Sequence, residues 1–215
     1  MRNLFLKAEH WQLFIVLVGP IALFQVIMVQ SMSSTFASFE NGQVPPKPEE
    51  FFSMFKFMPL LLVSMVTVQG GWLWSLGTGL HKKVPEHLQM NVKLFKGFLL
   101  VYTFYTIFIS SALSYIFSNI SFSDPTPDLS VLSYLPAIFA IILPLHFFAI
   151  FCIIYCMRFV AKTLKTAEIG KKVKSDDYIG EFFLLWFFFI GVWIIQPQVH
   201  KILNGEVTND SDLLV

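Results

Sequence analysis

The stretch WQLFIVLVGPIALFQVIMVQ, at residues 11–30, contains no Asp, Glu, Lys or Arg in 20 consecutive positions. A helix needs ~20 predominantly apolar residues to cross the ~30 Å hydrocarbon core of a bilayer. This stretch therefore predicts a membrane-spanning helix. Gly19 and Pro20 lie near its middle, and they predict a kink because proline cannot donate to the helical hydrogen-bond ladder.

Four further apolar segments follow, at about residues 57–80, 97–120, 132–157 and 178–199. Together the five segments predict an all-α fold, a polytopic transmembrane helical bundle in a single domain at residues 1–203. A polar tail at 204–215 is expected to be disordered. The uninterrupted apolar part of the fifth segment, 182–195, has only 14 residues. It is short enough to be a re-entrant or interfacial segment, so five spans and four spans both stay open.

The composition agrees with a membrane location. Hydrophobic residues make up 55% of the 215 residues, and charged residues make up 13%, against about 25% in an ordinary soluble domain. A water-soluble fold of this size could not hide so much apolar surface. The net charge is +1, which gives no global field that would recruit nucleic acid.

Basic residues predict the orientation, because they accumulate on the cytoplasmic side of membrane proteins. Twelve of the 15 basic residues lie before the first segment, between the second and third, or after the fourth. These twelve are Arg2, Lys7, Lys82, Lys83, Lys93, Lys96, Arg158, Lys162, Lys165, Lys171, Lys172 and Lys174. An alternating chain places all of them on one side. The N-terminus is therefore predicted to be cytoplasmic, and the basic loops are expected to attract anionic lipid headgroups.

Within the predicted spans, no acidic or basic residue lies deep in the membrane, which argues against a proton-coupled or sodium-coupled carrier. The intramembrane polar residues include Gln25, Gln69 and His146. They form a candidate polar cluster that could line a pore. The alternative is a neutral His146 that is hydrogen-bonded to a neighbouring helix, through Gln25 or Gln69.

Small residues mark a candidate helix-packing face. Ser110, Ser114 and Ser118 recur every four residues in the third segment, and this spacing lets a second helix approach closely, within the chain or from a partner. Cys152 and Cys156 are also four apart, but a zinc site would need two more ligands. We interpret these cysteines as apolar packing residues.

The sequence contains no phosphate-binding glycine loop, no HExxH motif and no nucleophile elbow. It gives no catalytic residue, no metal ligand set and no cofactor-binding residue, and we expect no cofactor. An acidic cluster at Asp176, Asp177 and Glu181 is interpreted as a helix cap with lysine partners.

The C-terminal run GEFFLLWFFFIGVWIIQP, at residues 180–197, resembles a group of uncharacterised multi-pass inner-membrane proteins of Bacteroidetes. The stretch VAKTLK at 160–165 and the opening HWQL at 10–13 are similar too. This resemblance covers about a third of the chain, and the motifs are hydrophobic. It implies a bacterial inner membrane and brings no activity with it.

Three functions fit these observations. The first is a non-enzymatic scaffold or accessory subunit of a membrane complex, with other membrane subunits or a second copy as partner. The second is a small passive channel or carrier for a neutral solute. The third is an enzyme that acts on lipid at the cytoplasmic face through His81, His87 or the pair Asp176 and Asp177.

Overall fold

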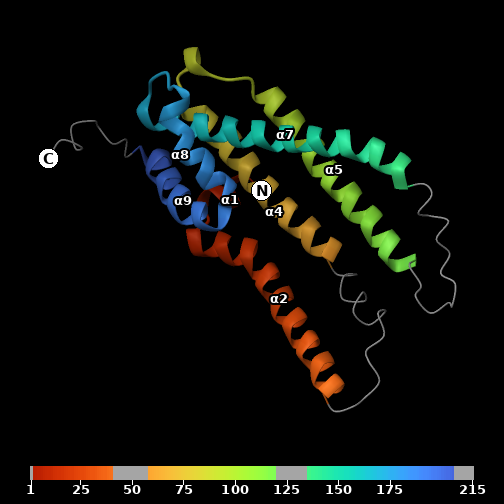
Figure 1. Cartoon of the computed structure of the whole chain (residues 1–215). Helices are drawn as coiled ribbons and strands as arrows, with labels where there is room; N and C mark the ends of the chain where they lie inside the picture. The colour runs from red at the N-terminus through yellow and green to blue at the C-terminus, as the bar shows by residue number, and fades with distance from the viewer. Residues whose placement is uncertain (1, 41–57, 120–134, 206–215) are drawn as a thin grey trace.

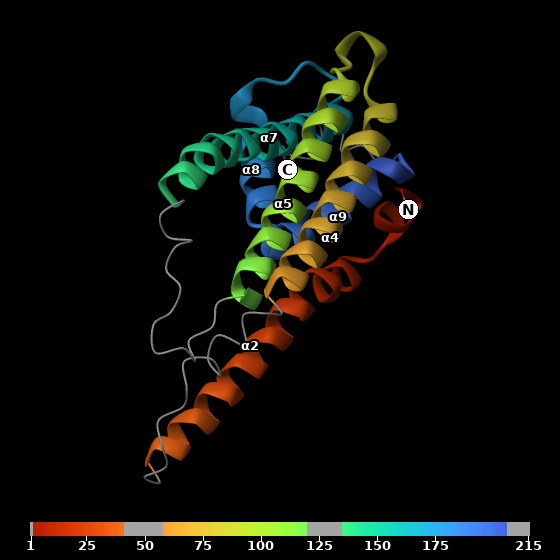
Figure 2. The same cartoon turned by 90° about the vertical axis from the view of Figure 1, so that its right-hand side faces the viewer.

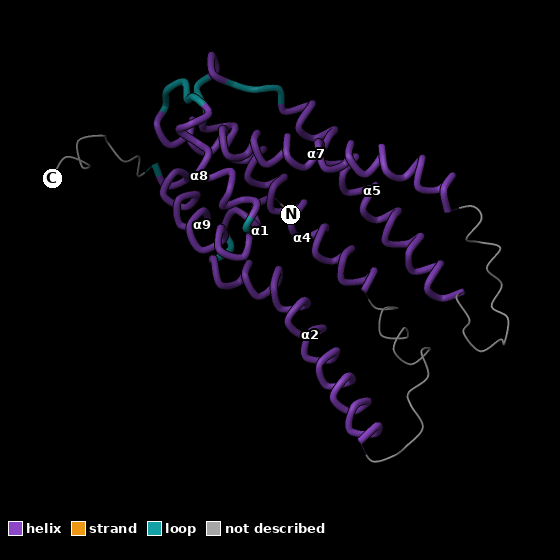
Figure 3. Tube along the Cα trace, viewed as in Figure 1, coloured by secondary structure: helices purple, strands orange, loops and turns teal. Residues whose placement is uncertain are grey.

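The computed structural model describes residues 2–40, 58–119 and 135–205, and it confirms the all-α fold. In these ranges every regular element is a helix (Figure 3). The elements are α1 (Arg2–Lys7), α2 (His10–Glu40), α4 (Met58–Gly79), α5 (Val92–Asn119), α7 (Leu135–Ile169), α8 (Ser175–Trp186) and α9 (Phe188–Asn204), with two short 3₁₀ turns at Leu80–Lys83 and Glu86–Leu88. Most of the predicted tail, together with residues 41–57 and 120–134, lies outside the described residues.

Four helices are long and apolar enough to cross a membrane: α2, α4, α5 and α7. The chain is therefore an integral membrane protein. Two of these helices are longer than the sequence predicted. α2 continues past residue 30 to Glu40, where Ser33 and Ser34 donate hydrogen bonds to the carbonyls of Gln30 and Ser31. α7 continues past residue 157 to Ile169, in a stretch where Arg158, Lys162 and Lys165 recur at helical spacing.

The predicted fifth span is not confirmed, because the chain at 178–199 forms two helices instead of one. α8 has 12 residues and α9 has 17, so they are about 18 Å and 25 Å long, and each is too short to cross the hydrocarbon core. The helix is interrupted at Phe187, whose φ of −89° and ψ of 60° are not helical. Aromatic residues on both sides favour the break, because they lose side-chain freedom in a helix.

α8 and α9 form a hairpin whose two ends lie at the same end of the bundle (Figures 1 and 2). At the start of the hairpin, Lys165 of α7 pairs with Glu181 at 3.3 Å. At its close, Lys83, which follows α4, donates to the carbonyl of Leu203 at 3.4 Å. We call this end of the bundle the basic end, and the opposite end the distal end.

The four long helices run alternately up and down, pack together at the basic end and spread apart toward the distal end (Figure 1). The axis of α2 also changes direction in its first half (Figure 1), where Pro20 removes a helical hydrogen bond. The buried core follows this arrangement. Its members include Leu13, Leu17, Trp72, Leu76, Leu80, Phe95, Leu99, Cys156, Val160, Leu164, Leu185, Val192, Ile195 and Val199.

Glycines on α4 allow its close packing with two neighbours. A Cβ at Gly77 would lie 2.6 Å from the ring of Phe95 on α5, and a Cβ at Gly79 would lie 2.5 Å from Leu6 on α1. Such contacts are closer than van der Waals distance, so only glycine fits without a shift. The short helix α1, which the sequence did not predict, is thereby packed against the last turns of α4.

Candidate functional site

The predicted polar cluster of Gln25, Gln69 and His146 is not joined by hydrogen bonds in the described part of the chain. Gln69 is buried on α4, whereas Gln25 is exposed on α2 and His146 is exposed on α7. His146 Nδ1 lies 3.1 Å from the hydroxyl of Tyr105 on α5. The predicted partner of His146 was Gln25 or Gln69, and the structure pairs it with this tyrosine instead, because α7 packs against α5.

Gln25 is one of the polar residues without a hydrogen-bond partner in the described part of the chain. Its side chain is exposed on α2, five residues after Pro20, and no described residue forms a hydrogen bond with its amide. Large apolar side chains surround it on the same helix: Leu23 is 64% exposed and Val26 is 63% exposed. An amide in the hydrocarbon region gains stability from a hydrogen bond to another helix, and none of the described residues supplies one to Gln25.

Two of the three serines on the predicted packing face of α5 have side chains that the structure describes. Ser110 is buried, and its Oγ has no hydrogen-bond partner among the described residues. Ser114 is half-buried. Ser118 lies in the last turns of α5, and its side chain is outside the described residues. The burial of Ser110 fits a helix-packing role within this chain.

Gln196 on α9 is a polar centre that the sequence did not reveal. Its side chain is fully buried, and its Oε1 accepts from the indole Nε1 of Trp72 at 3.2 Å. Its Nε2 donates to the carbonyls of Phe5 at 2.9 Å and Ala8 at 2.8 Å. One amide thus ties α9 to α4 and to the end of α1, where helix carbonyls lack intrahelical partners.

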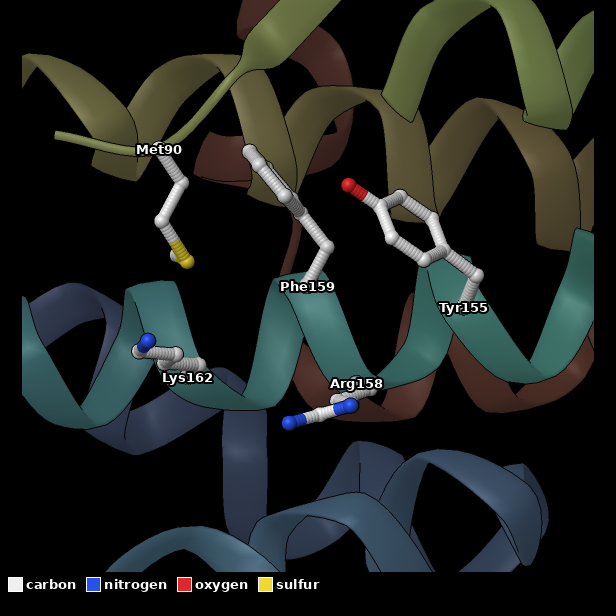
Figure 4. Close-up of a pocket in the computed structure, with 5 residues that line it drawn as sticks. All are labelled: Met90, Tyr155, Arg158, Phe159 and Lys162. Carbon is white, nitrogen blue, oxygen red and sulfur yellow. The ribbon is translucent and has the colours of Figure 1, made fainter. Parts of the chain in front are cut away.

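A small basic pocket lies at the basic end of α7, with a volume of about 240 Å³. Its walls are Met90, Tyr155, Arg158, Phe159 and Lys162. Figure 4 shows Tyr155, Phe159 and Met90 in a row along one side of α7, with Arg158 and Lys162 beside them on the helix. His81 contacts two of these residues, since its Nε2 donates to the carbonyl of Met90 at 3.0 Å and its ring stacks on Phe159.

The charges of this pocket are not neutralised within the described residues. Lys165, one turn further along α7, pairs with Glu168 at 3.0 Å and Glu181 at 3.3 Å. Arg158 and Lys162 have no carboxylate within ion-pair distance in the described chain. The guanidinium Nε of Arg158 donates instead to the hydroxyl of Tyr178 at 3.1 Å.

Tyr178 reports the positive potential beside the pocket. Burial raises the pKa of its phenol, but hydrogen bonds from Ser175 and Arg158 and the charges of Arg158 and Lys162 outweigh burial. The net effect is a pKa below the ordinary value of tyrosine. An anion is therefore stabilised at this position.

Two of the residues that the sequence offered for lipid chemistry, His81 and Asp177, form hydrogen bonds with backbone groups. Asp177 accepts from the backbone N–H of Lys174 at 2.6 Å and so caps α8. Glu181 forms the ion pair with Lys165. Cys152 and Cys156 are both buried and unpaired to each other. No group of three or more His, Cys, Asp or Glu side chains with metal-binding geometry occurs within residues 2–40, 58–119 and 135–205.

Comparison with known proteins gives no relative from which a function could be transferred. The chain matches no protein-family model, no curated protein and no solved structure.

Proposed function

We propose that this chain is a non-enzymatic accessory or scaffold subunit of a membrane complex, located in a bacterial inner membrane with its N-terminus in the cytoplasm. In this proposal four helices span the bilayer, and the α8–α9 hairpin enters from the cytoplasmic side and returns to it. The observation that carries the proposal is the exposed amide of Gln25 on a helix that leaves its own bundle.

The exposed surface of the distal part of α2 supports the proposal that a helix of another chain packs against it. From Leu23 to Phe36 its large apolar side chains are mostly exposed, with Phe36 at 63%. Lipid could cover these side chains, but lipid tails cannot satisfy the hydrogen bonds of Gln25. A partner helix that presents a polar side chain or a carbonyl satisfies both requirements.

The other two functions have less support from the geometry. A pore lined by Gln25, Gln69 and His146 would require these side chains to face a common space. They lie instead in separate exposed and buried environments. A lipid enzyme would need reactive groups aimed at a substrate, whereas His81 and Asp177 are held by backbone hydrogen bonds.

The test is extraction of the protein from native membranes in mild detergent, followed by native mass spectrometry of the purified complex. We expect a stoichiometric membrane partner with the natural chain. A Gln25→Leu variant should lose about 1–2 kcal/mol of association energy, which is about a five- to thirty-fold weaker complex.

Gln12→Leu is the matched control, because Gln12 is near the start of α2, where its Oε1 caps the helix by accepting from the N–H of Glu9. This control removes an amide from the same helix at the basic end, and it should leave the complex intact. A lone chain in both samples would contradict the proposal, and a complex of identical copies would identify the partner helix as a second α2.

A further inference from the structure

We propose that the pocket of Tyr155, Arg158 and Lys162 binds a phosphate oxyanion, as presented by the headgroup of an anionic phospholipid. The site is independent of the partner surface on α2, because it lies on α7 at the opposite end of the bundle. Phosphate is the shared chemistry of a lipid headgroup and of free inorganic phosphate, and the experiment below separates these two sources.

The two cations fit the recognition of a phosphate. Arg158 and Lys162 are four residues apart on α7 and both line the pocket, so they lie on one face of the helix. Because Nε of Arg158 is bound to the Tyr178 hydroxyl, the orientation of the guanidinium is fixed. Its terminal NH₂ groups can then donate two parallel hydrogen bonds to phosphate oxygens, and Lys162 supplies a second positive charge.

The wall of the pocket suits a lipid better than a larger soluble ligand. The pocket volume of about 240 Å³ is below the usual ~300–1,000 Å³ of sites that enclose a whole small molecule. It is large enough for a phosphate headgroup, with the rest of the lipid outside the pocket. Phe159 and Met90 form an apolar side, which matches the glycerol and first methylene groups of a lipid. The hydroxyl of Tyr155 adds a hydrogen-bond donor between the two regions.

The side chains along one face of α7 change from apolar to cationic, in the same order in which a phospholipid changes from acyl chain to phosphate headgroup. Phe151, Tyr155, Arg158 and Lys162 are spaced by four, three and four residues, so they form one stripe toward the basic end. Phe151 is 54% exposed and offers an apolar surface for an acyl chain. The stripe thus passes from hydrocarbon contact through a phenol to two cations at the level expected for headgroups.

The experiment measures binding of short-chain phosphatidylglycerol, short-chain phosphatidylcholine and inorganic phosphate to the full-length purified protein by native mass spectrometry. Phosphatidylglycerol should bind the natural protein. The double variant R158Q/K162Q should bind it about 30-fold more weakly, as expected for two lost headgroup cations. The control K171Q/K172Q removes the same charge from two exposed lysines outside the pocket, and it should stay within about threefold of the natural protein.

The single variant K162Q is the control for a folding defect, because the ammonium group of Lys162 has no ion pair or hydrogen bond to another described residue and only its backbone carbonyl accepts one, from Thr166. K162Q should retain the melting temperature and still weaken lipid binding about fivefold. If the protein binds inorganic phosphate but not phosphatidylglycerol, and the same variants lose this binding, the pocket is a phosphate site whose ligand is soluble. Equal losses in both double variants, or unchanged binding in R158Q/K162Q, would overturn the proposal.

Discussion

Replacement of Gln196 by leucine is expected to destabilise the bundle by about 2–4 kcal/mol, because it leaves several buried polar groups without partners. The indole N–H of Trp72 and the carbonyls of Phe5 and Ala8 all bond to this amide. Leucine has a similar volume, so the effect isolates the hydrogen bonds from the packing. The melting temperature of the detergent-solubilised protein should fall by about 5–15 °C.

Gln198→Leu is the matched control for this prediction. Gln198 is two residues further along α9 and half-buried, and its amide has no hydrogen bond to any other described residue. Its replacement should change the melting temperature by less than about 2 °C, as for surface substitutions in general. Equal melting of the two variants would show that the Gln196 amide does not hold α1 and α4 to α9.

Gly191→Ala should prevent the α8–α9 hairpin from closing. A Cβ at this position would lie 1.8 Å from the carbonyl oxygen of Leu184, and because that atom belongs to the backbone it cannot rotate away. The two helices must separate, at a cost of at least about 3 kcal/mol. Trp193 packs on His10 with ring centroids 4.7 Å apart, so its fluorescence should report the separation of α9 from α2.

Gly180→Ala provides the comparison within the same hairpin. No atom lies within 4 Å of a Cβ at Gly180, and alanine favours a helix over glycine by about 1 kcal/mol. This variant should therefore be as stable as the natural protein or more stable. If Gly191→Ala matched it in melting temperature and fluorescence, the close crossing at Leu184 would be wrong.

The sequence was a good guide wherever a single apolar run determines a helix. The predicted spans 57–80 and 97–120 agree closely with α4 at Met58–Gly79 and α5 at Val92–Asn119. Hydropathy within one run is a local property, so it carries over directly into the fold. The short apolar run at 182–195 indicated that this segment differs from the other four, and the helix there is interrupted at Phe187.

The candidate sites were harder to predict, because they depend on which helices meet. In the sequence, Gln196 lies near the end of the predicted fifth segment, and nothing nearby marks it as a polar centre. Its three partners come from residues more than 120 positions away. In the sequence, Arg158 and Lys162 are basic residues that indicate the orientation in the membrane. The pocket is not evident there, because Met90, which completes it, comes from a distant part of the sequence. The predicted polar cluster requires Gln25 to lie close to Gln69 and His146. The divergence of α2 from the other long helices after Pro20 prevents this contact.

In the proposed arrangement four helices span the membrane, the α8–α9 hairpin returns to the side from which it starts, and the phosphate pocket and the distal part of α2 lie at opposite membrane surfaces. Accessibility of single cysteines to a membrane-impermeant maleimide tests this directly in sealed spheroplasts, after Cys152 and Cys156 are replaced by alanine. The account predicts that Lys201→Cys, near the end of α9, stays unlabelled until the membrane is opened, as Lys82→Cys does, because both lie on the cytoplasmic side. Labelling of Lys201→Cys together with Lys47→Cys, in the segment between the first two spans, would show a fifth crossing and contradict the account.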